Sequence, residues 1–381
     1  MEQMSPSTVI GFIIGTIALI AGAELLVRGA SRIAASSGLS PVVIGLTVVA
    51  FGTSAPEFAV SVGAALRGTS DIALGNVVGS NIANILLVLG LSAVVGSGLV
   101  VAFRIVRVDV PLMIGASLAV MLLGLDGSLG RIDGAVFVLA LVGYLIWMVR
   151  SARDEVQSEV ASKTTDAQHA AEISLEYSSG LSNELSNRTS TIANIGMVAV
   201  GLVMLVIGAN LLVDAATSLA ASLGASEFVI GLTVVAVGTS LPEIATSVVA
   251  AARGHRDLAV GNAVGSNLFN ILGVLGTSSL LAPIAVSDTA LKFDIPFMLA
   301  TAIACLPIFI NGFVIKRWEG FVFVGYYVAY LVWLGLDASS SSVHTYFQTA
   351  MLTFVIPLTV MTLAIVGGRS VKHIRQHAPS R

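Results

Sequence analysis

Long apolar segments recur along almost the whole chain, separated by short turns that contain glycine, proline or charged residues. A helix needs about 20 consecutive apolar residues to cross the hydrocarbon core of a bilayer. By this measure the pattern predicts eleven membrane-spanning helices, at 9–27, 41–66, 72–95, 108–126, 134–150, 192–213, 227–252, 258–281, 295–313, 318–336 and 347–366. The one long polar stretch, 151–191, is rich in Ser, Thr, Asn and acidic residues. It predicts a solvated loop or a short surface helix.

Composition supports a polytopic membrane protein. Hydrophobic residues make up 56% of the 381 positions and charged residues only 11%, whereas soluble domains carry about 25% charged residues. An ordinary soluble enzyme is excluded because the charges could not cover its surface, and so is a disordered chain. The net charge of −3 gives no reason to expect nucleic acid as a partner. The single cysteine, Cys305, excludes an intrachain disulfide and a cysteine-rich metal site.

The placement of Lys and Arg predicts the orientation in the membrane. If the N-terminus lies outside, sixteen of the 19 basic residues fall on the cytoplasmic side, and only Arg67, Arg131 and Lys292 fall outside. We therefore expect a multi-pass protein of the cell (inner) membrane. Its N-terminus would lie outside, and the 151–191 loop and the C-terminus would lie in the cytoplasm.

The chain contains an internal repeat at an offset of 186 residues. Residues 44–57 (IGLTVVAFGTSAPE) and 230–243 (IGLTVVAVGTSLPE) are identical at twelve of fourteen positions, and 67–95 matches 253–281 at seventeen of twenty-nine. Each copy contains five predicted spans, and an odd number forces the second copy to cross the membrane in the opposite sense. Inverted repeats are typical of secondary transporters, whose substrate site lies near mid-membrane.

The predicted fold is therefore an all-α polytopic membrane protein. Two inverted five-helix repeats, 1–150 and 192–340, are joined by the cytoplasmic loop 151–191. Residues 341–381 add an extra C-terminal transmembrane helix and a basic cytoplasmic tail.

Two glutamates occupy equivalent positions deep in the second and seventh predicted spans, Glu57 and Glu243. A carboxylate at this depth is costly and normally faces a protein interior or a wet cavity. A protonated structural glutamate is the alternative, and the symmetric pair argues against it. Hydroxyl residues precede each acid, Thr53 and Ser54 in the first copy and Thr239 and Ser240 in the second. Such oxygens suit Na⁺, Ca²⁺ or Mg²⁺ better than zinc or copper, although the hydroxyls could instead bond to the preceding helical turn.

A proline lies directly before each acid, Pro56 and Pro242. Proline lacks the N–H that a helix needs, so carbonyls near Gly52 and Gly238 lose their helical partners. We expect a broken helix at each position, as in many transporters.

The second matched segment supplies amides and hydroxyls to the same region. Ser80 and Asn84 lie one helical turn apart, as do Ser266 and Asn270. All four are candidate cation ligands, with contacts that only hold helices together as the alternative. For the neighbouring asparagines the two interpretations are more evenly matched; these are Asn76, Asn81, Asn262 and Asn267.

The paired motifs GTSAPE with GNVVGSNIANIL, and GTSLPE with GNAVGSNLFNIL, resemble the cation/calcium exchanger superfamily, and in particular prokaryotic sodium/calcium exchangers. The resemblance covers ten spans and implies that spans two, three, seven and eight form an ion core, against which spans one and six slide. It implies side-chain ligands at Thr53, Ser54, Glu57, Ser80, Asn84, Thr239, Ser240, Glu243 and Ser266, and backbone carbonyl ligands at Ala50 and Ala236. Asn270 departs from the aspartate of several relatives, which argues against coupling to K⁺ and makes coupling to H⁺ less expected.

The sequence thus predicts an antiporter that exchanges Na⁺ for Ca²⁺ at a mid-membrane site. The expected partners are Ca²⁺, Na⁺ and lipid, with no cofactor, no enzymatic activity and a monomeric state. The alternative is a Ca²⁺/H⁺ antiporter or another cation exchanger of the superfamily. A passive cation channel, and an intramembrane enzyme with Glu57 and Glu243 as acid and base, remain as rival classes without a supporting motif.

Overall fold

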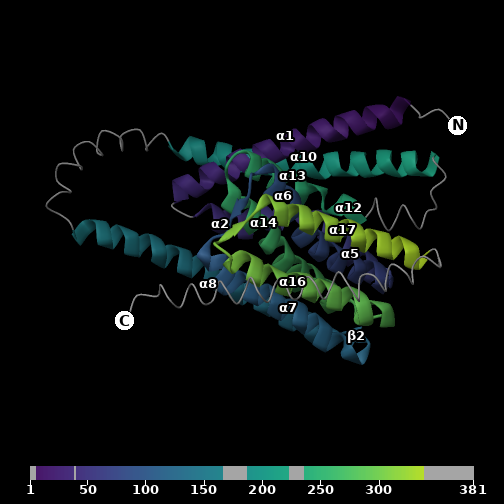
Figure 1. Cartoon of the computed structure of the whole chain (residues 1–381). Helices are drawn as coiled ribbons and strands as arrows, with labels where there is room; N and C mark the ends of the chain where they lie inside the picture. The colour runs from purple at the N-terminus through teal and green to yellow at the C-terminus, as the bar shows by residue number, and fades with distance from the viewer. Residues whose placement is uncertain (1–5, 38–39, 166–186, 223–235, 339–381) are drawn as a thin grey trace.

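The computed structural model describes residues 6–37, 40–165, 187–222 and 236–338, and it consists of packed helices with two very short strand pairs (Figure 1). Among these residues, eight helices are long and apolar enough to cross a membrane. A ninth candidate is the bent pair Val42–Thr53 and Ala55–Leu66, and Leu241–Ala252 forms a shorter apolar helix. The predicted polytopic membrane fold is confirmed. The eleventh span, 347–366, and the first part of the seventh, 227–235, lie outside the described residues.

The first half begins with α1 (Pro6–Ser37), followed by α2 (Pro41–Ile44), η1 (Gly45–Val49), α3 (Ala50–Thr53) and α4 (Ala55–Leu66). It continues with α5 (Ser70–Ala83), η2 (Asn84–Leu89), α6 (Gly90–Val95) and β1 (Leu99–Val100). It ends with η3 (Ile105–Asp109), α7 (Val110–Leu123), η4 (Gly124–Asp126), β2 (Ser128–Leu129) and α8 (Arg131–Thr165).

The second half begins with α10 (Asn187–Ser222), α12 (Ala236–Thr239) and α13 (Leu241–Ala252). It continues with α14 (Arg256–Leu268), η7 (Phe269–Leu275), α15 (Gly276–Leu281) and β3 (Ile284–Ala285). It ends with η8 (Ala290–Asp294), α16 (Ile295–Ile310), β4 (Val314–Ile315) and α17 (Arg317–Ala338).

Helix α8 extends beyond the fifth predicted span. Its membrane-spanning part, Arg131–Met148, lies close to the predicted 134–150, and the helix then continues to Thr165. Residues 151–165 contain Ala, Glu, Arg, Gln and Lys, which are good helix formers. The helix can therefore continue after its apolar part has ended.

The second matched segment of each half forms the centre of the bundle. Within an apolar stretch of 18 residues in each span, the buried share is 94% for Arg256–Leu281 and 78% for Ser70–Val95, but only 28% for Thr8–Ala34 and Ile192–Ala215. Short π-helical segments interrupt both central spans, η2 in the first and η7 in the second. Such segments occur often at functional sites.

Helices α1 and α10 lie side by side along the outside of the bundle (Figure 1). Glycines allow their backbones to approach closely, as in other membrane helix pairs. A Cβ atom added to Gly201 would lie 2.8 Å from the carbonyl oxygen of Gly22, and one added to Gly208 would lie 2.8 Å from that of Gly15. No larger side chain fits at these positions without moving the helices apart.

The two strand pairs connect loops from opposite halves. Leu99 of β1 pairs with Ile315 of β4, and Ser128 of β2 pairs with Ala285 of β3, both antiparallel. By the repeat, β1 corresponds to β3 and β2 to β4, so the same pairing occurs twice with the halves exchanged. This is expected if a two-fold relation connects the halves. Each pair also joins loops that the charge distribution assigns to the same side of the membrane.

Candidate functional site

The second predicted span is broken as the sequence predicts. Helix α3 ends at Thr53, Ser54 adopts φ −79° and ψ 8°, and α4 starts at Ala55 with Pro56 in its first turn. The two parts meet at an angle of 47°. Because Pro56 has no N–H, it cannot bond to the carbonyl of Gly52 as a regular helix would require. The break places Glu57 in the first turn of α4.

The seventh predicted span repeats this geometry. Helix α12 ends at Thr239, Ser240 adopts φ −87° and ψ 3°, and α13 begins at Leu241 with Pro242 in its first turn. Glu243 lies in the first turn of α13 and is fully buried, as is Glu57 in α4. Both acids therefore lie at helix starts, where the helix dipole favours a negative charge.

Hydrogen bonds cross from each broken helix to the glutamate of the other. Ser54 Oγ donates to Glu243 Oε1 at 3.2 Å, and Ser240 Oγ donates to Glu57 Oε1 at 3.4 Å. Ser80 Oγ from α5 donates to the same oxygen of Glu57 at 3.4 Å. Among the described residues, Glu57 Oε2 and Glu243 Oε2 have no hydrogen-bond partner. The fold thus brings both acids into one buried cluster, in which each retains an oxygen that can accept a cation.

The central spans add further polar groups to the cluster. Ser266 lies beside the carboxylate of Glu243. Asn84 is 1% exposed and Asn270 is fully buried, and neither amide makes a hydrogen bond within the part of the chain that the structure describes. A buried polar group without a partner costs about 1–3 kcal/mol, which is tolerated most easily where a ligand completes the site. Asn84 opens η2 and Asn270 lies in η7.

The two threonines make hydrogen bonds across the halves. Thr53 Oγ1 donates to Asn262 Oδ1, and Thr239 Oγ1 donates to Asn76 Oδ1, both at 3.3 Å. For Asn76 and Asn262 the sequence did not decide between a cation ligand and a contact that holds helices together. Their position in the repeated GN pair, one turn before Ser80 and Ser266, was the available signal.

The resemblance also implies that the backbone carbonyls of Ala50 and Ala236 are cation ligands. The carbonyl of Ala50 already accepts a hydrogen bond from the backbone N–H of Ser54 at 3.0 Å, and it lies 3.4 Å from Thr53 Oγ1 as an alternative acceptor to Asn262 for the single hydroxyl proton. Ala236 is the first residue of α12. The role of either carbonyl as a cation ligand stays a prediction.

The donor set of the cluster consists of carboxylate, hydroxyl and amide oxygens. In the described part of the chain, no group of three or more His, Cys, Asp or Glu side chains is placed to hold a metal ion. Oxygen ligands with only two carboxylates suit hard cations such as Na⁺ and Ca²⁺.

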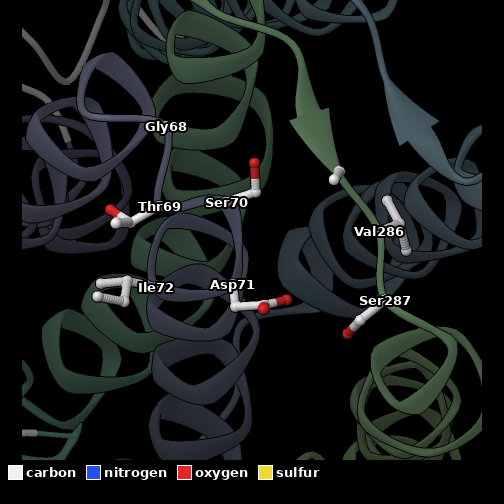
Figure 2. Close-up of a pocket in the computed structure, with 8 residues that line it drawn as sticks. Gly68, Thr69, Ser70, Asp71, Ile72, Val286 and Ser287 are labelled. Carbon is white, nitrogen blue, oxygen red and sulfur yellow. The ribbon is translucent and has the colours of Figure 1, made fainter.

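A separate pocket of about 490 Å³ lies at the turn between α4 and α5, facing the segment after β3. Asp71 and Ser287 approach it from opposite walls (Figure 2). Its lining also includes Gly68, Thr69, Ser70, Ile72, Ala285 and Val286. None of the predicted site residues lines it, so this pocket is distinct from the buried cluster.

Comparisons with known proteins agree with the geometry. The sodium/calcium exchanger protein family matches residues 7–150 and 193–336. The sodium/calcium exchanger MaX1 of Methanosarcina acetivorans is 34% identical over 321 residues, which cover 74% of this chain and 85% of that protein. The inner membrane protein YrbG of Escherichia coli is 36% identical over 251 residues, covering 66% of this chain and 73% of that protein.

Among solved structures, the sodium-calcium exchanger NCX_Mj superposes with a TM-score of 0.71 at 31% identity, covering 86% of this chain and 99% of that chain. The family and its structural neighbours are transporters and not enzymes, so an intramembrane enzyme is ruled out as the class of this protein. The chain is a multi-pass membrane protein that belongs to the sodium/calcium exchanger protein family.

Proposed function

We propose that this protein exchanges Na⁺ for Ca²⁺ by alternating access, with both cations binding between Glu57 and Glu243. The observation that carries the proposal is the pair of crossed contacts, Ser54 to Glu243 and Ser240 to Glu57, within a fully buried cluster. These contacts make one site from two halves of one chain. A monomer therefore suffices, and the transported cations are the only metal ions required.

The charge of the cluster favours these cations. Two ionised carboxylates carry about two negative charges, which one Ca²⁺ or two Na⁺ would neutralise. Ca²⁺ takes six to eight oxygen ligands. The carboxylates can supply several of them, and the remaining candidates are Thr53, Ser54, Ser80, Asn84, Thr239, Ser240, Ser266 and Asn270.

Shared ligands explain why the movements of the two cations are coupled. If Na⁺ and Ca²⁺ both need Glu57 and Glu243, then occupancy by one excludes the other. Competition for a single site that opens alternately to either side gives antiport. Gradients and membrane voltage would set the direction, because the two halves contribute nearly equivalent residues. With the predicted orientation, an inward Na⁺ gradient would expel Ca²⁺ from the cytoplasm.

The test is ⁴⁵Ca²⁺ uptake into proteoliposomes loaded with Na⁺. We expect the double variant Glu57→Gln, Glu243→Gln to lose Na⁺-driven uptake, since it removes the charge but keeps the shape of both side chains. Asp288→Asn is the matched control, because Asp288 is exposed and pairs only with Lys292 at 2.6 Å. Uptake at the wild-type rate by the double variant would overturn the proposal.

Ca²⁺/H⁺ exchange is the second candidate. Glu57 and Glu243 are both fully buried in one cluster, where two ionised carboxylates would repel each other, and a proton could relieve this repulsion as a cation does. Omitting Na⁺ and imposing a pH gradient separates the two functions. Uptake driven by the pH gradient alone would favour H⁺ coupling, and uptake without any counter-ion would indicate a channel.

A further inference from the structure

We propose that Asn76 and Asn262 are positioning residues, each of which fixes the hydroxyl of the threonine in the opposite half. This inference rests on the proposed function, because it concerns how Thr239 and Thr53 present their oxygens to the transported cation. It starts from the two equivalent contacts between halves, Thr239 with Asn76 and Thr53 with Asn262.

The orientation of the Asn76 amide is determined by its surroundings. Its Nδ2 donates to the backbone carbonyl of Glu57 at 3.2 Å and to Ser61 Oγ at 2.9 Å. A carbonyl oxygen can only accept, so the nitrogen must face Glu57. Ser61 in turn donates its own proton to the carbonyl of Ala73 at 3.3 Å, which leaves its oxygen free to accept. The oxygen of Asn76 must therefore face Thr239.

This arrangement dictates the direction of the Thr239 proton. An amide oxygen has no hydrogen, so the hydroxyl of Thr239 must donate to it. A hydroxyl has one proton and two lone pairs, and once the proton points toward Asn76 the lone pairs point elsewhere. A cation is attracted to the lone pairs and repelled by the proton. Asn76 thus keeps Thr239 in the state that can bind a cation.

The second half repeats the two side-chain contacts of Asn76. Asn262 Nδ2 donates to Ser247 Oγ at 2.9 Å, and its Oδ1 accepts from Thr53. Thr53 also lies beside the carboxylate of Glu243, so its hydroxyl is at the site. When a cation draws the carboxylate oxygens toward itself, Asn262 still offers the Thr53 proton an acceptor.

The contacts predict an unusual pattern of energetic coupling. Asn76 lies in the first half but acts on Thr239 of the second, and Asn262 acts on Thr53 of the first. A residue that merely supports its own helix would show no such preference for the opposite half. Double-mutant cycles measure this preference, because residues that act through one another give non-additive effects.

The experiment measures equilibrium ⁴⁵Ca²⁺ binding to the purified full chain, with Na⁺ competition as a second readout. Thr239→Val should weaken Ca²⁺ binding about tenfold, the scale of one lost polar ligand. Asn76→Ala should weaken it severalfold, and should weaken it by a clearly smaller factor in a chain that already carries Thr239→Val. In a chain that carries Thr53→Val, in contrast, Asn76→Ala should weaken Ca²⁺ binding by the same factor as it does in the wild-type chain.

The reciprocal cycle repeats the test with Asn262→Ala, which should be non-additive with Thr53→Val and multiplicative with Thr239→Val. If a variant in one of the two cycles fails to fold, the other cycle still tests the inference. If an asparagine variant weakens Ca²⁺ binding by the same factor in both threonine variants, this inference is wrong. The assignment of the threonines as ligands would remain intact. If neither threonine variant changes binding of Ca²⁺ or Na⁺, both this inference and the proposed ligand set fail.

Discussion

The hydroxyl of Ser54 donates a hydrogen bond to Oε1 of Glu243 at 3.2 Å, although Glu57 is the acid that follows it three residues later in the chain. Ser240 makes the equivalent contact with Glu57. Each half therefore orients the acid of the other, and neither half can complete the site alone.

Removing the Ser54 hydroxyl should weaken cation binding without abolishing it. We expect Ser54→Ala to raise the Ca²⁺ concentration for half-maximal uptake by a factor of about ten to one hundred, because a hydrogen bond to a charged group contributes about 1.5–3 kcal/mol. Ser36→Ala is the control, since Ser36 is exposed and its hydroxyl donates to the carbonyl of Ile33 on its own helix at 3.1 Å. Equal uptake curves for Ser54→Ala and Ser36→Ala would contradict the crossed contact.

Calcium should stabilise the folded protein, and its removal should lower the melting temperature. A ligand at one hundred times its dissociation constant adds about 2.7 kcal/mol to stability. Thermal unfolding in detergent, with Ca²⁺ or with a chelator, measures this difference. In the Glu57→Gln, Glu243→Gln variant the two curves should coincide, and a full Ca²⁺ shift in that variant would place the binding elsewhere.

The close packing of α1 on α10 should make Gly201 intolerant of even one methyl group. An added Cβ would lie 2.7 Å from the backbone nitrogen of Leu26 and 2.8 Å from the carbonyl oxygen of Gly22. We expect Gly201→Ala to cost about 1–3 kcal/mol of stability, the usual range for overpacking.

Gly196 provides the matched control on the same helix, because nothing lies within 4 Å of its added Cβ. Gly196→Ala should be neutral or stabilise the protein by up to about 1 kcal/mol, since alanine is the better helix former. Melting temperatures that fall equally in both variants would contradict the packing described for α1 and α10.

Tyr144 should matter for stability because its hydroxyl donates to the fully buried carboxylate of Asp109 at 2.8 Å. Tyr144→Phe removes that bond and should cost about 1–3 kcal/mol. The equivalent bond in the second half, from Tyr330 to Asp294, is longer at 3.4 Å and lies in a half-buried place. Tyr330→Phe should therefore cost less, and a larger loss for Tyr330→Phe would show that burial does not govern the effect.

Much of the architecture could be predicted from the chain alone. Apolar length determined the spans, because a bilayer imposes one length on every crossing helix. Proline chemistry at Pro56 and Pro242 determined the breaks, since a missing N–H acts locally. The repeat indicated Glu57 and Glu243 as a pair, because two acids are rarely retained at equivalent buried positions without a common role.

Tertiary structure decided which groups meet. The sequence grouped Thr53, Ser54 and Glu57 on one short stretch. In the structure each of them also has a hydrogen-bond partner in the other half, which is Asn262 for Thr53, Glu243 for Ser54 and Ser240 for Glu57. The same limit applies to Asp109, which precedes α7 and accepts a hydrogen bond from Tyr144, 35 residues later in the chain. Periodicity and local chemistry act within a few residues, whereas contacts between halves arise only when distant helices pack and bury the same polar groups together.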